Sequence, residues 1–517
     1  MQFRVKIDMR NNFLLTAATF AAVLAVAGCG GKNTKATDAG ESAAKDEKAA
    51  APAAPASRWA SDPFASTYAP YASKTTVIKG ATILTGAGER IDNGVVVIEN
   101  GKIAGVGGAD LVSPAGAVVI DAKGKWVTPG IIDVHSHLGD YPSPSTESTS
   151  DGNEATAPNT SQVWAEHSVW PQDAGFTRAL AGGVTTLQIL PGSANLFGGR
   201  SAILKNVPSR TVQGMKFPGA PYGLKMACGE NPKRVYGEKG GPATRMANFA
   251  GYRAAWIEAA DYKKKWEKYW DEKDAYDKKH GAKAKAKAAK AEGGDKEPEA
   301  PTRDLKLETL AMALNGDITV NMHCYRGDEM AQVIDMAKEF GYKVTTFHHA
   351  VEAYKVADIL AENGICAAVW ADWWGFKLEA YDGIRENAAL VDAQPNGCTI
   401  IHSDDEYGIQ RLNQEAGKAM ADGNKMGLKI SPEHAMKWLT LNPATALKIA
   451  DKTGSLEAGK MADVVIWNAD PFSVYAKTEK VFVDGALLYD ASDPKRSPRM
   501  DFEIGQDGQG FTGGSGQ

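Results

Sequence analysis

The chain carries GIIDVHSH at residues 130–137, an apolar run that ends in His135-Ser136-His137. In a β-strand, residues i and i+2 point to the same side, so both imidazoles can reach one metal ion at about 2.0–2.1 Å. Two histidines facing solvent would give the same pattern, so the pair alone only suggests a metal site. We expect a strand that ends at His135 and delivers two candidate ligands.

Seven further β-type runs follow the first, and helical patterns such as residues 328–340 separate several of them. The runs lie at 185–190, 201–205 and 222–227 and begin near Ile318, Lys343, Ile365 and Thr399. Such alternation is typical of βαβ units and a parallel sheet. Eight strands predict an α/β fold with a closed (β/α)8 TIM-like barrel, whose functional residues lie at the C-terminal ends of the strands.

Other predicted strands end in the same kinds of side chain. His323 closes the fifth strand, His348 and His349 close the sixth, and Asp404 follows the eighth. Each histidine alone would fit a buried structural role. Because all of these strand ends meet at one mouth if the barrel closes, the pattern predicts a metal centre of imidazole and carboxylate ligands.

The two ends of the chain have a different composition. Short strand-like runs with turn dipeptides fill residues 75–128, and a second set fills 451–492. We expect both sets to form one small β-sandwich beside a barrel at 129–450. The polar stretch 30–74 predicts a flexible tether, and 493–517 predicts a flexible tail.

The N-terminal segment is typical of an export signal. Residues 1–29 combine a basic start with an apolar run and end in VAGC. This ending resembles the lipobox of bacterial lipoproteins, which makes Cys29 a lipid anchor; an ordinary cleaved signal is the alternative. Gly30 follows in place of an aspartate, so the resemblance favours the outer membrane over the inner membrane and a periplasmic location.

One segment interrupts the barrel pattern. Residues 261–290 hold eleven lysines and six acidic residues, which would suit an anionic partner. Its aromatic residues, however, follow a helical stripe: Tyr262, Trp266, Tyr269 and Tyr276. We therefore expect an inserted helix at about 258–303 that lays this face on the barrel and leaves its lysines in solvent.

Composition excludes several classes of protein. A formal net charge of −5 gives no global attraction to nucleic acid, so we expect no nucleic-acid partner. The five cysteines contain no C-x-x-C pair, which excludes a cysteine-based zinc module. The pairing of the four cysteines beyond Cys29 cannot be deduced from the sequence.

These motifs resemble the amidohydrolase superfamily of metal-dependent hydrolases over residues 76–490. The resemblance rests on VTPGIIDVHSH at 127–137, AGGVTT at 181–186, LNPA at 441–444 and GSLEAGKMAD at 454–463. HCYR at 323–326 and ADWW at 371–374 are similar to the exported imidazolonepropionase-like and prolidase-like branch. The resemblance implies a barrel with an attached β-sandwich that hydrolyses amide-like C–N bonds.

The resemblance also implies one or two divalent metal ions, most simply Zn²⁺, although manganese, cobalt or iron would fit the same ligands. His135, His137 and Asp404 would bind the more buried ion. His323 and His349 would bind the second ion. His349 is preferred over His348 because it precedes a small residue, as the metal histidine of the family does.

Lys225 lies where the binuclear members of the family carry a carboxylated lysine that bridges two ions. The alternative is a lysine paired with Glu230 or Asp404 in a mononuclear site. In either case, a metal-bound water has its pKa lowered from 15.7 towards about 7. Asp404 would accept the proton of this water and return it to the leaving nitrogen.

The substrate contacts expected from the sequence lie beyond three strand ends. Arg326 can clamp a substrate carboxylate or pair with Asp328, and Tyr325 can donate to an oxyanion. Trp373 and Trp374 form an aromatic wall or simply pack, and His402 completes the set. We expect a small-molecule or short peptide substrate: a peptide, an N-acyl amino acid or a cyclic amide.

Three alternatives stay open at this point. The same centre would support hydrolysis of lactones or of phosphotriesters, and a non-catalytic surface lipoprotein would use the same scaffold. A membrane contact through Cys29 and a homo-oligomer are both compatible with the sequence.

Overall fold

A computed structural model describes residues 57–59, 62–143, 145–288 and 296–497. These residues belong to one compact unit that begins at Ala56. The predicted signal peptide with Cys29 and most of the predicted tail lie outside the described residues. Among those that are described, no helix is both long and apolar enough to cross a membrane.

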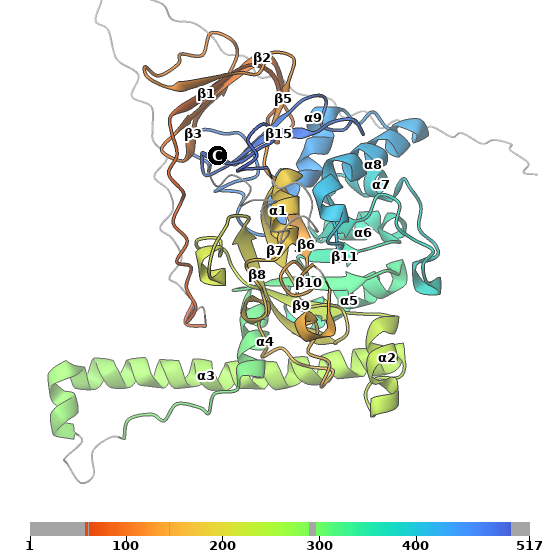
Figure 1. Cartoon of the computed structure of the whole chain (residues 1–517). Helices are drawn as coiled ribbons and strands as arrows, with labels where there is room; N and C mark the ends of the chain where they lie inside the picture. The colour runs from red at the N-terminus through yellow and green to blue at the C-terminus, as the bar shows by residue number, and fades with distance from the viewer. Residues whose placement is uncertain (1–56, 60–61, 144, 289–295, 498–517) are drawn as a thin grey trace, which may run out of the picture. The chain divides into compact units, whose positions relative to one another are not determined.

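An eight-stranded sheet forms the centre of this unit, and its strands are neighbours in chain order from β6 to β13 (Figure 1). They are β6 (Ile131–Ser136), β7 (Val184–Ile189), β8 (Phe197–Lys205), β9 (Gly223–Ala227), β10 (Thr319–Cys324), β11 (Thr346–His349), β12 (Cys366–Val369) and β13 (Thr399–Ile401). All eight coincide with predicted strands. The sheet is nearly closed: β13 and β6 form no ladder, but the N–H of Asp404 donates to the carbonyl of His135 at 3.0 Å.

The third strand, β8, departs from the predicted parallel barrel because it runs antiparallel to both β7 and β9. Only residues 190–196 connect β7 to β8. A parallel crossover needs about a dozen residues or more, so this connection can only form a hairpin. The prediction of eight parallel strands was therefore wrong at this position, and no helix lies between β7 and β8.

Helices connect and flank the other strands (Figure 1). They are α1 (Ala174–Ala181), α2 (Glu230–Tyr236), α3 (Arg245–Ala288), α4 (Leu305–Asn315), α5 (Gly327–Phe340), α6 (Ala357–Glu362), α7 (Asn387–Asp392), α8 (Leu412–Met426), α9 (Pro432–Ala435) and α10 (Leu441–Ala446). In α5, Met330, Val333, Ile334 and Ala337 recur at helical spacing and are buried. Gly341 ends this helix at φ 78°, a conformation that glycine adopts without steric cost.

The second sheet contains strands from both the N-terminal and the C-terminal parts of the described chain. Its order is β16-β15-β14-β5-β1-β2-β3, and β4 pairs with β1. The strands are β1 (Thr76–Leu84), β2 (Arg90–Glu99), β3 (Lys102–Gly107), β4 (Val118–Asp121), β5 (Trp126–Pro129), β14 (Val464–Trp467), β15 (Thr478–Val483) and β16 (Ala486–Asp490). The antiparallel pair of β5 with β14 makes the junction. The hydrogen bonds thus connect all eight strands into one continuous sheet. That this sheet folds into the two layers of a β-sandwich stays a prediction.

The charged insert is a helix, but it begins at Arg245, ahead of the predicted start, and bends at Gly281. Its aromatic face is covered partly by the N-terminal segment, since Trp59 packs edge-on against Trp270 with ring centroids 4.7 Å apart. The described part of residues 57–74 is therefore not the free tether that composition predicts. The N–H of Thr67, for example, donates to the carbonyl of Gln213 at 3.0 Å.

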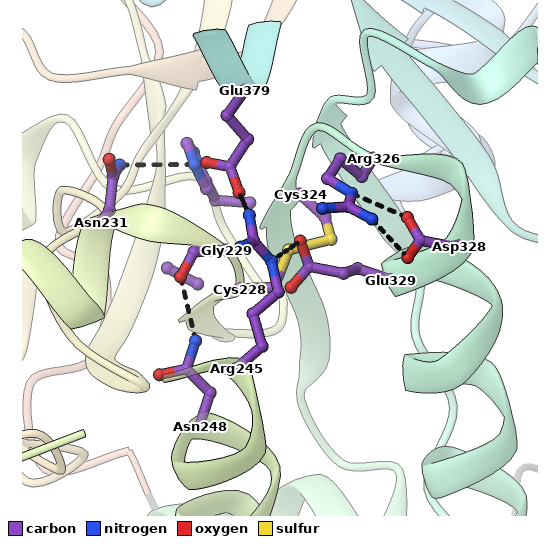
Figure 2. The surroundings of a disulfide bond; sticks show 12 residues. Cys228, Gly229, Asn231, Arg245, Asn248, Cys324, Arg326, Asp328, Glu329 and Glu379 are labelled. Atoms are coloured by element: carbon purple, nitrogen blue, oxygen red, sulfur yellow. Dashed lines mark hydrogen bonds and ion pairs between the residues drawn. A yellow bond between two sulfur atoms is a disulfide. The ribbon is translucent and has the colours of Figure 1, made fainter. Parts of the chain in front are cut away.

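Two disulfides connect neighbouring strands of the barrel. Cys228–Cys324 joins the residue after β9 to the last residue of β10 (Figure 2). Cys366–Cys398 joins the first residue of β12 to the residue before β13. The first bridge therefore lies at the C-terminal end of the strands, and the second lies at the opposite end.

Candidate metal centre

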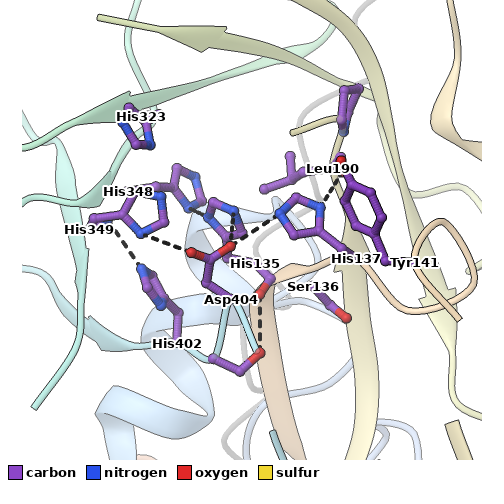
Figure 3. A network of polar contacts seen from close by, with 12 residues as sticks. His135, Ser136, His137, Tyr141, Leu190, His323, His348, His349, His402 and Asp404 are labelled. Atoms are coloured by element: carbon purple, nitrogen blue, oxygen red, sulfur yellow. Dashed lines mark hydrogen bonds and ion pairs between the residues drawn. The ribbon is translucent and has the colours of Figure 1, made fainter. Parts of the chain in front are cut away.

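The ends of β6 and β13 bring two histidines and an aspartate together (Figure 3). Oδ1 of Asp404 lies 3.1 Å from Nε2 of His137 and 3.3 Å from Nε2 of His135. Asp404 has a left-handed backbone with φ 57°, which is rare outside glycine and is often found at functional sites. The fold thus holds an unusual backbone conformation that turns this carboxylate onto the two imidazoles.

A hydrogen-bonded chain behind His135 decides which of its nitrogens carries the proton. The Asn321 amide donates to Thr319, so its oxygen faces His348 and accepts from Nε2–H at 3.1 Å. Nδ1 of His348 is then an acceptor, and it lies 2.9 Å from Nδ1 of His135. His135 must therefore donate from Nδ1. Its Nε2 is buried, forms no hydrogen bond within the described part of the chain, and keeps a lone pair.

His137 is oriented in the same way by the hairpin between β7 and β8. Its Nδ1 lies 2.7 Å from the Leu190 carbonyl, which can only accept a hydrogen bond. In the neutral ring, the lone pair on Nε2 then also faces Oδ1 of Asp404, whereas a protonated ring would donate to that oxygen. Two imidazole lone pairs and a carboxylate oxygen repel one another unless a proton or a metal cation lies between them, and this donor set is one that Zn²⁺ and similar ions prefer. The residues fit a metal ion.

Two further histidines border this group. Nδ1 of His349 lies 3.7 Å from Oδ2 of Asp404 and is buried without a hydrogen-bond partner in the described residues. Nε2 of His402 accepts the backbone N–H of His349 at 3.1 Å. His402 therefore helps to hold His349 in its left-handed conformation, φ 67°. Both lie close enough to His135 to share an ion with it.

Burial sets the charge of the centre. It lowers the pKa of His135 and of His349 well below the ordinary 6.5, so both imidazoles are neutral ligands at neutral pH. Burial by itself raises the pKa of the Asp404 carboxyl, but a proton on the facing imidazole of His349 or of His137 outweighs burial and holds that pKa below its ordinary value, so a proton shared by this group would lie on an imidazole and not on the carboxylate. Asp404 is therefore ionised.

His323 lies beside His349, with ring centroids 4.6 Å apart. Nζ of Lys377 donates to Oδ1 of Asn231 at 3.1 Å, which turns the amide nitrogen toward Nε2 of His323 at 3.3 Å. The lone pair of His323 is thus engaged by Asn231. The structure brings together the ligands predicted for one ion, and the second ion at His323 and His349 stays a prediction.

Lys225 points into the barrel, where it is wholly buried. Its amino group donates to the Pro191 carbonyl at 2.9 Å, and neither Glu230 nor Asp404 forms an ion pair with it among the described residues. Burial lowers its pKa to about 8. The alternative of a lysine paired with a carboxylate is therefore not what the structure contains.

The aromatic residues at the mouth differ in part from the prediction. Tyr325 is buried beside His323, with ring centroids 4.6 Å apart. Trp370, which sequence patterns did not single out, stacks on His349 at 4.4 Å. Trp373 is 40% exposed and lies next to Trp370, while Trp374 packs against the cluster that contains Tyr325. Trp370 forms the wall that was predicted for the two later tryptophans.

Arg326 does not act as the predicted carboxylate clamp. Nε and one terminal nitrogen donate to the two oxygens of Asp328 at 2.9 and 2.8 Å (Figure 2), so the salt-bridge alternative is the correct one. Lys377 supplies a cation beside the centre instead, with its Nζ 4.3 Å from the ring centroid of Tyr325. Lys377 lies in a loop after β12, and no sequence signal pointed to it.

A barrel with His-x-His at its first strand and an aspartate after its eighth defines an amidohydrolase-type protein. Residues 126–488, more than half of the chain, match the profile of the Amidohydrolase family, and the chain belongs to this family. A crystal structure of an amidohydrolase from Thermotoga maritima matches with a TM-score of 0.67 and 34% identity, over 80% of this chain and 100% of that one.

Two curated relatives differ in how much of their length is matched. "Amidohydrolase tasK" from Hapsidospora irregularis is 32% identical over 416 residues, which are 77% of this chain but only 40% of that protein. Imidazolonepropionase from Fusobacterium nucleatum is 23% identical over 443 residues, 77% of this chain and 92% of that protein. The chain thus spans less than half of the first relative.

Proposed function

We propose that the protein is a metal-dependent amidohydrolase that cleaves an amide-type C–N bond in a peptide, an N-acyl amino acid or a cyclic amide. The observation that carries this proposal is the convergence of Nε2 of His135 and Nε2 of His137 on Oδ1 of Asp404. His135, His137 and Asp404 would hold the ion, with His349 at its border. When bound, a divalent ion, most simply Zn²⁺, supplies Lewis-acid chemistry to a water and to the substrate carbonyl.

Asp404 is the proposed general base and acid. It is ionised, and Oδ2 lies on the side of His349, away from the two histidines that face Oδ1. Oδ2 takes the proton of the attacking water as the new C–O bond forms. It then returns that proton to the leaving nitrogen as the C–N bond breaks.

Lys225 is the proposed site of carboxylation. With a pKa of about 8, about a tenth of its amines are neutral at pH 7 and able to attack CO₂. The Nζ–C bond forms as Nζ loses a proton, and the product is an anionic carbamate. This change would replace a buried cation by an anion and supply the ligand that a second ion at His323 requires, after Asn231 has moved away.

Two side chains support a substrate that carries a carboxylate. Tyr325 lies beside His323 and His349 and offers a hydroxyl to a developing oxyanion. Lys377 presents a cation over the ring of Tyr325. It pairs with Glu230 at 3.3 Å, and a substrate carboxylate would compete for this ammonium group. Peptides and N-acyl amino acids are therefore favoured over neutral lactams.

Export to the periplasm with a lipid anchor at Cys29 is part of the same proposal. Two disulfides within the barrel support it, because such bridges persist in oxidising compartments. A homo-oligomer stays a proposal without a specific contact behind it.

The test couples metal analysis of the purified protein to hydrolysis screens. Dipeptides, N-acyl amino acids and cyclic amides form the main library, and lactones and phosphotriesters form the control library. We expect bound divalent metal and turnover of amides that is lost with a chelator and restored by metal. Turnover confined to the control library would refute the proposed bond type, and a protein without metal and without turnover would refute the proposal.

A further inference from the structure

A second cavity, of about 660 Å³, lies on the outer side of the barrel. Gly199 of β8 faces inward as the register partner of Lys225, so the next residue, Arg200, faces outward. Between β8 and β9 the chain forms only a short 3-10 helix, η3 (Val212–Gly214). The space is surrounded instead by α4, the middle of α3 and the segment around Phe64. The residues that matter below are Arg200, Trp164, Phe64, Trp266, Arg303 and Glu308.

Arg200 is a buried cation that forms no direct ion pair within the described residues. The residue is 3% exposed, its Nε–H donates to the Thr309 hydroxyl at 2.8 Å, and its guanidinium lies 4.2 Å from the ring centroid of Trp164. In the same part of the chain, no acceptor binds its terminal nitrogens. Buried donors are normally hydrogen-bonded, so these open donors call for an acceptor. Burial lowers its pKa only to about 10, so it stays charged at neutral pH.

The carboxylates near Arg200 are already engaged. Glu308 pairs with Arg303 at 2.6 Å, and Glu166 pairs with Lys216 at 3.0 Å. Asp62 also pairs with Lys216, at 2.8 Å, so these three carboxylates balance the charges of Arg303, Lys216 and Arg200 taken together. None of them contacts Arg200, so its terminal nitrogens keep open hydrogen-bond donors. The two terminal nitrogens of Arg200 can donate in parallel, which matches the two oxygens of a carboxylate.

The walls of the cavity favour a flat apolar body. Trp164, Phe64 and Trp266 line it together with Trp270. Aromatic walls gain most from another ring, because offset and edge-on ring contacts add to the burial of apolar area. Gln162, which also lines the cavity, has a buried side-chain oxygen without a hydrogen-bond partner in the described part of the chain. This oxygen would accept from an N–H of the ligand.

We propose that this cavity binds an aromatic carboxylate, with the carboxylate on Arg200 and the ring against the tryptophans. The site is separate from the metal centre, because Arg200 and Lys225 leave the barrel wall on opposite faces. It does not depend on the proposed hydrolytic function. A ring N–H, as in an indole, would satisfy Gln162.

The test uses two ligands of the same shape, indole-3-acetate and indole-3-acetamide, in calorimetric titrations of the full chain. We expect the acid to bind, and the neutral amide to bind at least about tenfold more weakly because it lacks the charge-assisted pair. The Arg200→Met and Arg200→Lys variants should bind indole-3-acetate more weakly by a similar factor. Arg253→Met, at an arginine of α3 that pairs with Glu339 and does not line the cavity, is the matched control.

Two further measurements keep the outcome decisive. Thermal unfolding shows whether each Arg200 variant folds, and Trp164→Leu tests the wall if it does not. Asp404→Asn and Lys377→Met should leave binding of the acid unchanged. Equal affinity for acid and amide, no binding of the acid at millimolar concentration, or loss of binding only in the Asp404 and Lys377 variants would each overturn the proposal.

Discussion

Nδ1 of His348 lies 2.9 Å from Nδ1 of His135, and this contact decides which nitrogen of His135 faces Asp404. His348 is not placed to share the ion itself, because its other nitrogen donates to Asn321. It acts by orienting a ligand, and such partners typically change metal affinity without contacting the metal.

His348→Phe keeps the ring volume and removes the acceptor for His135. We expect metal affinity to fall about 10–100-fold, the range typical of groups that orient metal ligands. Competition with a chromophoric chelator measures this directly. His434→Phe, at a histidine that pairs with Asp392 outside the centre, is the control. Unchanged affinity in His348→Phe would contradict the proposed chain of hydrogen bonds.

Asp404→Asn tests the general base. Turnover should fall by at least the roughly 10²–10⁴ typical of acid–base groups, with metal content measured on the same sample to separate metal loss from lost proton transfer. Asp405→Asn is the matched control at the adjacent position, where the carboxylate accepts the N–H of Tyr407 instead. Full metal with full turnover in Asp404→Asn would show that another group moves the proton.

Lys377→Met tests substrate recognition. For substrates that carry a carboxylate, we expect KM to rise about tenfold or more with a smaller change in kcat, because the lost contact does not involve the reacting atoms. Esterified or amidated versions of the same substrates should show no such rise. Lys425→Met, at an exposed lysine of α8, controls for loss of charge alone. An equal effect on charged and neutral substrates would argue against this role.

The buried carboxyl of Asp140 should make the unfolding temperature depend on pH. Burial raises its pKa well above the ordinary 3.8, and one of its oxygens has no hydrogen-bond partner among the described residues. A raised folded-state pKa means that the ionised form is disfavoured by folding, so stability is lost as pH rises above about 4. Asp140→Asn should therefore raise the unfolding temperature at pH 7, and the difference should shrink as pH falls toward 4.

Asp335→Asn, at an exposed aspartate of α5, is the control for Asp140→Asn and should change the unfolding temperature little at any pH. A lower unfolding temperature for Asp140→Asn at pH 7 would indicate that the carboxylate has a partner, such as a bound cation, in the protein in solution.

The two disulfides should differ in how much they contribute to the free energy of unfolding. Cys228–Cys324 closes a loop of 96 residues and Cys366–Cys398 a loop of 32, so loss of the first should cost more, within the roughly 2–5 kcal/mol seen for native bridges. Paired serine substitutions followed by denaturant unfolding give both values. Loss of the first bridge should weaken binding of the proposed second ion, because this bridge ties together β9 and β10, which carry Lys225 and His323, whereas loss of the second bridge should not. A similar loss from the second bridge would contradict this reasoning.

Sequence reasoning located the eight barrel strands and the residues of the metal group, because strand ends follow from local patterns of apolar residues. It failed where the outcome depends on tertiary contacts. Arg326 found a carboxylate two residues away, whereas Lys377 reaches the centre from a loop without a pattern. The choice of His349 over His348 rested on family resemblance, and the structure adds a physical reason, since both nitrogens of His348 are engaged.

The antiparallel direction of β8 could also be predicted from the sequence, because the predicted strands at 185–190 and 201–205 leave only residues 191–200 between them, fewer than the dozen or so that a parallel crossover needs. The regular spacing of the later strands masked this signal. The number of residues between consecutive predicted strands therefore distinguishes a hairpin from a crossover.

That hairpin constrains how the protein can diversify. Its carbonyls at Leu190 and Pro191 accept from His137 and Lys225, so an insertion there would disturb two functional side chains at once. In the loop after β12, by contrast, Trp373 and Lys377 form no hydrogen bond to His135, His137 or Asp404 within the described residues. New substrate ranges among close relatives should therefore arise by change in the loop after β12, while the length of the β7–β8 connection stays fixed.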